Sequence, residues 1–341
     1  NKVLELLSNK SRFIDKIIRI IIDFFAKKIE KIRGNSASQY YINSHKIPYH
    51  LLNLFDVAEK KLSYESDSLP YQTIFDILRE NKKKFLWIAY PTDNLTTNGI
   101  LSKFRSIDKI TNYDFIFLHF GEIDWLGHIF GPESDKIGEK LFEIDKAIHI
   151  IYKNLTSDGI KIKFILFGDH GMVNVNKSIS LFSVLNSRGI QITNKDIYFL
   201  DSIMFRYWNN DEKKFENIKN YLDNLEFGTV LHKEKIKELH YNFPHNKYGD
   251  LIFLLKPGYI FFPNFFQNSS MPRGMHGYGP DCKDNNGFLL LYWNKIKEQY
   301  TLNSKKDDLT SLFSVFVELF KKLNYKHIKN NPKKNMLIKI F

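Results

Sequence analysis

The stretch that decides the fold is "FILFGDHGM", residues 164–172. Four apolar residues end in Gly168, and Asp169 and His170 follow at once. The apolar run predicts a buried strand over 162–167. A buried strand has no use for a carboxylate and an imidazole side by side at its tip, because burying such groups without partners is costly. The pair therefore indicates that a functional site begins where this strand ends.

The sequence on either side of this stretch alternates between short apolar runs and amphipathic segments. Continuous apolar strands separated by helices are typical of a parallel sheet that is covered on both faces. We therefore expect an α/β fold with a mostly parallel sheet and helices on both faces. Strands are predicted at 85–90, 114–120, 162–167 and 287–293, and helices at 70–79, 99–109, 133–155 and 308–323.

The alternation is interrupted between residues 197 and 275. A strand at 197–208, a charged helix, two further strands and a second helix predict a small α+β insertion that caps the site. The expected organisation has three parts. Residues 1–62 hold an amphipathic helix and an irregular segment, residues 63–196 and 276–341 form the α/β core, and residues 197–275 form the insertion.

Charge and cysteine content indicate which binding partners and which cellular location to expect. The net charge is +12, which favours anionic partners, but the lysines are spread through several helices and we predict no specific nucleic-acid binding. The single cysteine, Cys282, rules out a disulfide framework and favours a cytoplasmic location. Residues 13–33 predict a basic amphipathic helix that either packs on its own domain or lies on an anionic membrane surface as a peripheral attachment.

Three segments place aspartate and histidine where predicted strands end. Asp124 and His128 are four residues apart, so they share one side of a helical turn. Asp169 and His170 form the second pair, and His276 lies in a glycine-rich loop. Two carboxylates and three imidazoles suit Zn²⁺ or Mn²⁺. Each pair alone could be structural, but the three together favour a metal site.

The segments "DWLGHIFGPES", "FGDHGM" and "HGYGPD" resemble, in order and spacing, the type I phosphodiesterase/nucleotide pyrophosphatase branch of the alkaline phosphatase superfamily. The resemblance covers about residues 63–325. It implies a hydrolase of phosphate esters with two divalent metal ions, zinc in the first place and manganese as the alternative. It also implies that Asp124, His128 and His276 hold one ion, and that Asp169 and His170 hold the other.

The sequence departs from the family pattern before residue 63. The family has a first strand that ends in a metal-binding aspartate and then a Ser or Thr nucleophile, and neither is visible here. Thr96 and Thr97 follow the strand at 85–90, which in the family comes after the nucleophile. We therefore expect a fragment that lacks its nucleophile and is inactive alone. A phosphotransferase, a mutase, a sulfatase-like enzyme and a non-catalytic metal-binding domain remain as alternatives.

Overall fold

The structure is a computed structural model, and it describes most of the chain between residues 61 and 293. The described residues are 17, 18, 20–25, 28, 61, 62, 64–89, 96–157, 162–193, 195–239, 248–267 and 269–293. The chain divides into two compact units, which we describe separately. Among the described residues, unit 1 contains 124–137 and 170–286 together with the helical residues before 29, and unit 2 contains 61–123, 138–169 and 287–293.

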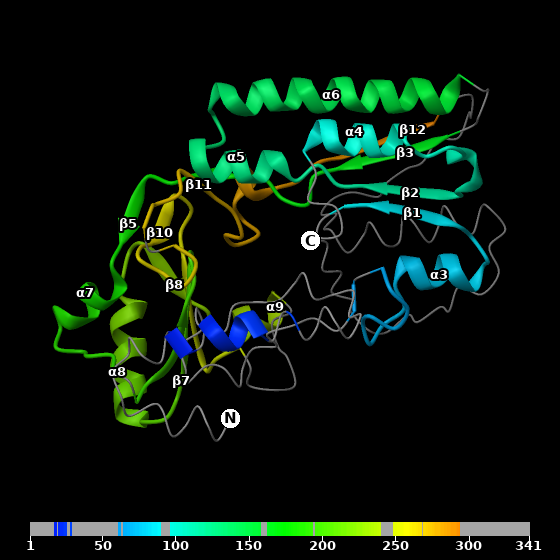
Figure 1. Cartoon of the computed structure of the whole chain (residues 1–341). Helices are drawn as coiled ribbons and strands as arrows, with labels where there is room; N and C mark the ends of the chain where they lie inside the picture. Colours follow the sequence, from blue (N-terminus) through cyan, green and yellow to red (C-terminus); the bar gives the residue numbers. More distant parts are fainter. Residues whose placement is uncertain are drawn as a thin grey trace. The chain divides into compact units, whose positions relative to one another are not determined.

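Unit 2 carries the strands that the apolar runs predict. Strands β1 (Phe85–Ile88) and β2 (Phe115–Leu118) pair in parallel, whereas β12 (Leu289–Trp293) pairs antiparallel with β3 (Lys163–Phe167). Both pairs can be followed in Figure 1. The fold is thus α/β, but a mostly parallel sheet is not confirmed, because the described strands form small sheets of both kinds.

The helices of unit 2 surround a small apolar core. The elements are α3 (Ile74–Glu80), α4 (Thr97–Arg105), the 3₁₀ turn η4 (Ile110–Asn112) and α6 (Asp135–Thr156). Ile88 of β1 packs with Ile100 and Phe104 of α4 and with Ala147 and Ile151 of α6. Apolar residues at helical spacing on α4 and α6 therefore bury one side of each helix, as expected for amphipathic helices.

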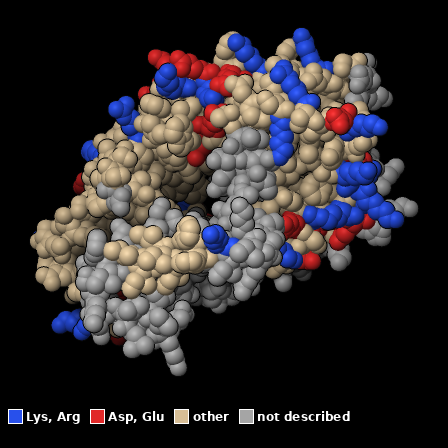
Figure 2. Space-filling view, in the orientation of Figure 1, with Lys and Arg blue, Asp and Glu red and all other residues tan. Residues whose placement is uncertain are grey.

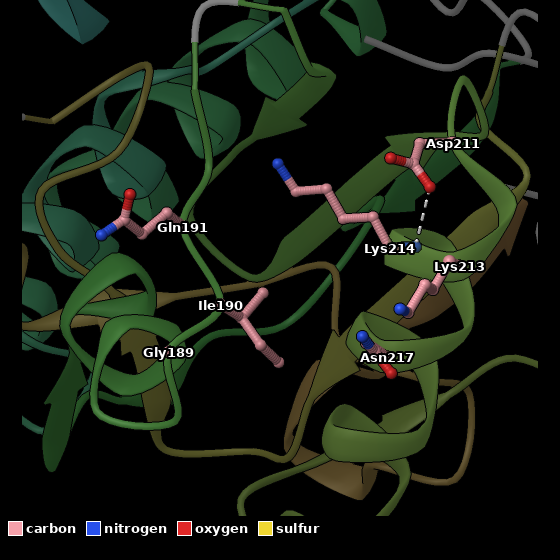
Figure 3. Close-up of a pocket in the computed structure, with 7 residues that line it drawn as sticks. All are labelled: Gly189, Ile190, Gln191, Asp211, Lys213, Lys214 and Asn217. Atoms are coloured by element: carbon pink, nitrogen blue, oxygen red, sulfur yellow. Dashed lines mark hydrogen bonds between the residues drawn. The ribbon is translucent and has the colours of Figure 1, made fainter.

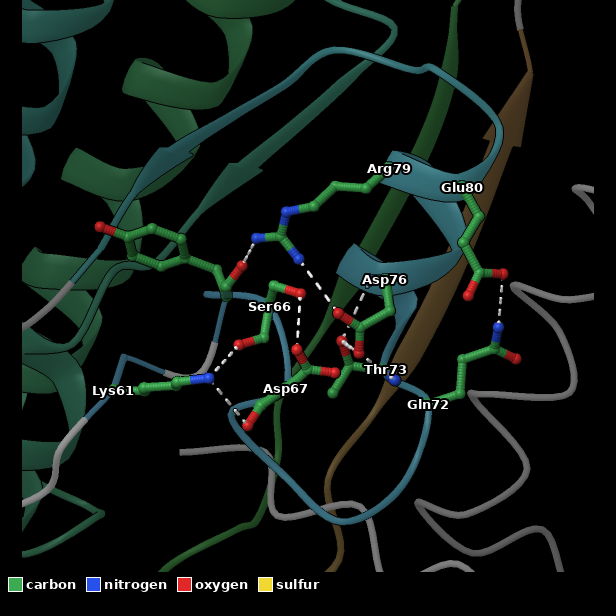
Figure 4. Close-up of polar contacts among 9 residues, drawn as sticks. Lys61, Ser66, Asp67, Gln72, Thr73, Asp76, Arg79 and Glu80 are labelled. Atoms are coloured by element: carbon green, nitrogen blue, oxygen red, sulfur yellow. Dashed lines mark hydrogen bonds and ion pairs between the residues drawn. The ribbon is translucent and has the colours of Figure 1, made fainter.

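The start of the first predicted helix differs from the structure. The first predicted helix begins at Ile74 and not at Pro70, because Thr73 and Asp76 form a reciprocal capping box (Figure 4). The helix predicted over 133–155 is present as α6, and a separate helix, α5 (Glu122–Phe130), precedes it. Helix α5 carries Asp124 and His128, so the expected helical spacing of this pair is present.

Unit 1 is built on a four-stranded antiparallel sheet in the order β6-β7-β9-β8. Its strands are β6 (Ile197–Leu200), β7 (Met204–Trp208), β8 (Gly228–Val230) and β9 (Leu251–Leu255). The single strand predicted over 197–208 is wrong. Asp201 divides it into two, because its Oδ1 atom accepts hydrogen bonds from the backbone of Ile203 and Met204 and closes a turn.

Three helices accompany this sheet: α7 (Leu181–Asn186), α8 (Glu212–Asp223) and α9 (Lys233–Glu238). The Asp211 side chain caps α8 by accepting a hydrogen bond from the Lys214 backbone at 3.1 Å (Figure 3). A pocket of about 330 Å³ lies between the start of α8 and Gly189–Gln191, and Figure 3 shows the residues that line it. None of the five predicted site residues lines this pocket.

Short strand pairs lead from the sheet toward the predicted site residues. Strand β10 (Tyr259–Phe261) pairs in parallel with β5 (Lys177–Ile179), and β11 (Gly274–Met275) pairs antiparallel with β4 (Val173–Asn174). The second pair matters for the site. It sets the segment that ends in His276 beside the segment that begins with His170, although the two are a hundred residues apart in the sequence.

The remaining expectations fall on the ends of the chain or on its surface. The described residues between 17 and 28 are helical, as expected, and none of the helices described is long and apolar enough to cross a membrane. The rest of 1–60 and the predicted helix at 308–323 lie outside the described residues. On the face shown in Figure 2, basic and acidic side chains are interspersed.

Candidate metal centre

The site begins with a close approach between helix α5 and strand β11, both parts of unit 1 here. A Cβ atom added at Gly274 would overlap the carbonyl oxygen of Gly127, so only glycine fits at this point of β11. The contact places the imidazole of His128 beside the strand, where its Nδ1 atom lies 2.9 Å from the carbonyl oxygen of Gly274. The orientation of His128 is therefore set by two glycines that have no ligand chemistry of their own.

Three imidazoles converge on one carboxylate oxygen of Asp124. The distance from Asp124 Oδ1 to Nε2 is 3.4 Å for His128, 3.4 Å for His276 and 4.0 Å for His170. The rings of His170 and His276 are stacked, with centroids 3.7 Å apart and an angle of 14° between their planes. Four of the five predicted site residues thus meet within unit 1.

The hydrogen bonds behind the rings fix which nitrogen faces the centre. His128 Nδ1 lies 2.9 Å from the carbonyl oxygen of Gly274, and His170 Nδ1 lies 2.9 Å from that of Gly171. A carbonyl oxygen can only accept, so both Nδ1 atoms carry the proton, and the Nε2 atom of each neutral ring keeps its lone pair. This is the arrangement that metal-binding histidines show, with the second nitrogen bonded to a backbone carbonyl.

Asp124 Oδ1 itself is shielded from solvent and makes no hydrogen bond. Buried polar atoms nearly always have a partner, and here three imidazole nitrogens lie 3.4 to 4.0 Å away, two of which present lone pairs. Ligand atoms from Asp124, His128 and His276 all lie within 4.8 Å of one another. A cation would satisfy the carboxylate and the imidazoles together, so these residues make an Asp/His site that fits a metal ion.

Asp169, the fifth predicted ligand, belongs to unit 2, while the next residue, His170, belongs to unit 1. Its role at a second ion stays a prediction. His170, which the resemblance assigns to that second ion, lies with the other three around Asp124 Oδ1. The expected separation of the ligands into two sets therefore also stays a prediction.

Thr96 and Thr97, which the sequence pattern does not favour as nucleophiles, lie at the start of α4 in unit 2. Thr97 is 1% exposed, and both its backbone N–H and its hydroxyl donate to Glu122 Oε2, at 2.5 and 2.7 Å. Burial alone would raise the pKa of Glu122, but the hydrogen bonds from Thr97 and Lys140 outweigh it, and the pKa is lowered. Thr96 caps the helix by accepting from the Gly99 backbone. Both hydroxyls therefore have structural roles, one in bonding Glu122 and one in capping α4.

Residues 23–279 match the family model described as "Type I phosphodiesterase / nucleotide pyrophosphatase". The chain belongs to this family. The matched region of this type I phosphodiesterase/nucleotide pyrophosphatase family member includes all five predicted ligands: Asp124, His128, Asp169, His170 and His276.

Individual relatives come from two groups of enzymes. The chain is 37% identical over 75 residues to the human "GPI ethanolamine phosphate transferase 2, catalytic subunit", covering 20% of this chain and 8% of that protein. It is 25% identical over 176 residues to human "Ectonucleotide pyrophosphatase/phosphodiesterase family member 7", covering 40% of this chain and 37% of that protein. The matched segments thus span less than half of these relatives.

A solved structure supports the fold. Human ectonucleotide pyrophosphatase/phosphodiesterase 5 superposes with a TM-score of 0.56 at 19% sequence identity, and the match covers 76% of this chain and 72% of that one. At this identity the likeness concerns the fold alone. It agrees with the α/β architecture that the alternating strands and helices of the sequence predict.

Proposed function

We propose that this chain forms the metal-binding part of an enzyme that cleaves phosphate diesters. The observation that carries the proposal is the convergence of three imidazole Nε2 atoms on the shielded, unbonded Oδ1 atom of Asp124. Membership of the type I phosphodiesterase/nucleotide pyrophosphatase family supports phosphate esters as the substrate class.

The ligand set and its metal are part of this proposal. Asp124, His128 and His276 would hold one divalent ion, and Asp169 with His170 would contribute to a second. Imidazole and carboxylate ligands favour Zn²⁺, with Mn²⁺ as the alternative. Such ions supply a Lewis acid for the phosphoryl oxygens and stabilise charge on the attacking and leaving oxygens. The chain's own contribution is to aim the three Nε2 atoms at one point and to bond the Nδ1 atoms of His128 and His170 to backbone carbonyls, which leaves the Nε2 atoms of these two rings free to bind.

Metal binding by the chain tests the ligand assignment directly. We expect isothermal titration with Zn²⁺ to give a dissociation constant at least tenfold weaker for Asp124→Asn and for His276→Gln than for the unaltered chain. His149→Gln, an exposed histidine on α6, is the matched control and should bind like the unaltered chain. Equal binding by all four proteins would contradict the assignment.

Phosphoryl transfer to an alcohol is the second candidate activity. It is suggested by the similarity of part of this chain to proteins named GPI ethanolamine phosphate transferase 2. Hydrolysis and transfer differ only in the group that finally accepts the phosphoryl group. We suggest incubating the protein with bis(p-nitrophenyl) phosphate, Zn²⁺ and a primary alcohol, and identifying the phosphorus-containing products by ³¹P NMR. Both reactions release p-nitrophenol. Nitrophenyl phosphate as the sole phosphorus-containing product indicates hydrolysis, and an alkyl nitrophenyl phosphodiester indicates transfer.

We also propose that the helical residues 17, 18 and 20–25 contact an anionic membrane surface. Ile17, Ile20, Ile21 and Phe24 follow helical spacing, and each is at least 41% exposed, whereas Asp23 is buried. Basic residues flank this apolar side in the sequence, which is the composition of helices that lie in a membrane interface.

Vesicle sedimentation tests this contact. We expect the protein to pellet with vesicles of phosphatidylserine and phosphatidylcholine but not with phosphatidylcholine alone. The variant Ile20→Gln/Phe24→Gln should remain in the supernatant in both cases. Sedimentation of the double variant to the same extent as the unaltered protein would show that the helix is not the contact.

A further inference from the structure

Asn285 joins the two loops that present His170 and His276. Its side-chain Oδ1 atom accepts a hydrogen bond from the Gly277 backbone at 2.8 Å, and its Nδ2 atom donates to the carbonyl oxygen of Tyr278 at 3.2 Å. Its own carbonyl oxygen accepts from the Gly171 backbone at 3.0 Å. One residue is therefore bonded to the chain directly after each of the two histidines.

The fit around this residue is tight. A Cβ atom at Gly171 would overlap the carbonyl oxygen of Asp284. The residue after His170 must therefore be glycine for this segment to pack against residues 284–286. Asn285 ends the 3₁₀ turn η5 (Lys283–Asn285), and its backbone N–H donates to Cys282 within that turn. Asn285 is thus held by its own turn while it bonds to the histidine loops, all of them in unit 1.

The amide side chain of Asn285 meets two requirements at this position. The Gly277 N–H needs an acceptor and the Tyr278 carbonyl needs a donor, and asparagine offers both from one planar group. An aspartate of the same shape would keep the acceptor but would set a carboxylate oxygen against the Tyr278 carbonyl. An alanine would remove both bonds.

We propose that Asn285 is the positioning residue that holds the imidazoles of His170 and His276 stacked with Nε2 toward Asp124. The inference rests on the proposed function, because the pair is positioned for a metal ion. Metal ligands depend on the groups that orient them, and loss of such a group commonly weakens metal affinity 10- to 100-fold. Asn285 acts on two histidines at once, whereas the carbonyls of Gly274 and Gly171 each orient one.

The test uses three variants of the full chain: Asn285→Ala, Asn285→Asp and the control Asn286→Ala, which removes an exposed amide one residue away. Isothermal titration with Zn²⁺ should show affinity reduced at least tenfold for both Asn285 variants and unchanged for the control. Thermal unfolding in EDTA measures the stability of the metal-free fold. We expect the isosteric Asn285→Asp variant to melt within a few degrees of the unaltered chain.

Imidazole signals separate this inference from the proposed function. Long-range ¹H–¹⁵N spectra of the metal-free chain should show His170 and His276 altered in both Asn285 variants, with His128 and His149 unchanged. Unaltered signals together with Zn²⁺ affinity within twofold would overturn the positioning role. If the unaltered chain binds no Zn²⁺ although the His170 and His276 signals respond to Asn285, the proposed function fails and the positioning of the two rings stands.

Discussion

At the scale of single residues, buried charge in unit 1 is stabilised by hydrogen bonds. Asp196 is 2% exposed, and burial alone would raise its pKa. Hydrogen bonds from Lys214, the Thr193 backbone, Tyr207 and the Thr193 hydroxyl outweigh this and lower the pKa of Asp196 from 3.8 to about 2. The lowered pKa means that the folded state favours the charged form.

This difference predicts how Asp196 contributes to stability as pH changes. The contribution is complete above the unfolded pKa near 4 and is lost as pH falls toward 2, because the folded carboxylate then gains its proton as well. A shift of this size corresponds to roughly 2 kcal/mol. We expect urea unfolding to show Asp196→Asn destabilised by about that amount at pH 7 and by much less at pH 2.5. Asp108→Asn, an exposed aspartate, should show no such dependence.

Thr97 gives a second prediction at this scale. Its hydroxyl donates to the Glu122 carboxylate inside unit 2, and valine would keep the volume but remove the donor. Hydrogen bonds to charged groups contribute about 1.5–3 kcal/mol. We expect Thr97→Val to lower the free energy of unfolding by that amount in urea titration and to leave Zn²⁺ affinity unchanged. Loss of Zn²⁺ binding in a folded Thr97→Val protein would contradict the structural role.

At the scale of elements, helix starts depend on caps that apolar periodicity does not reveal. Thr73 and Asp76 bond reciprocally at the start of α3, and Arg79 pairs with Asp76 at 3.1 Å (Figure 4). Removing a Thr cap costs about 1 kcal/mol. We expect Thr73→Ala to lower the free energy of unfolding by that amount. Gln72→Ala, which removes only an exposed hydrogen bond to Glu80, should stay within 0.5 kcal/mol.

The elements also show what the sequence could and could not predict. Four apolar residues in a row were enough to locate β1 and β2, and all of their side chains, on either face, are buried or half-buried. Pairing direction was not predictable in the same way. Strand β12 is as apolar as the parallel strands but runs antiparallel to β3, since direction depends on the path of the chain between strands and not on their composition.

At the scale of the whole molecule, the histidines could be found from sequence but their supports could not. Asp124, His128, His170 and His276 each follow a predicted strand or a glycine-rich turn, which is where α/β sheets place their sites. Asn285 and Gly127 carry no ligand chemistry, and their roles depend on contacts across 114 to 147 residues of sequence. Gly127 directly before His128 was the one available signal.

A metal-dependent shift in stability is the corresponding prediction for the whole molecule. A ligand that binds only the folded state stabilises it by about 2.7 kcal/mol at a hundred times its dissociation constant. We expect Zn²⁺ at that concentration to raise the melting temperature by several degrees in differential scanning fluorimetry, and EDTA to reverse the change. Asp124→Asn should show no rise. A rise of the same size in that variant would indicate that Zn²⁺ binds elsewhere.

The contact between Gly127 and Gly274 has a consequence for judging related chains. Two motifs that lie far apart in the sequence approach each other closely here, and Gly274 cannot be exchanged for a larger residue without a clash with the Gly127 carbonyl of the other motif. A homologue could retain every aspartate and histidine of the centre and still lose His128 from it through a single alanine at position 274. Inspection of the residue at position 274, rather than a count of surviving ligands alone, should therefore distinguish family members that still bind metal from those that have degenerated.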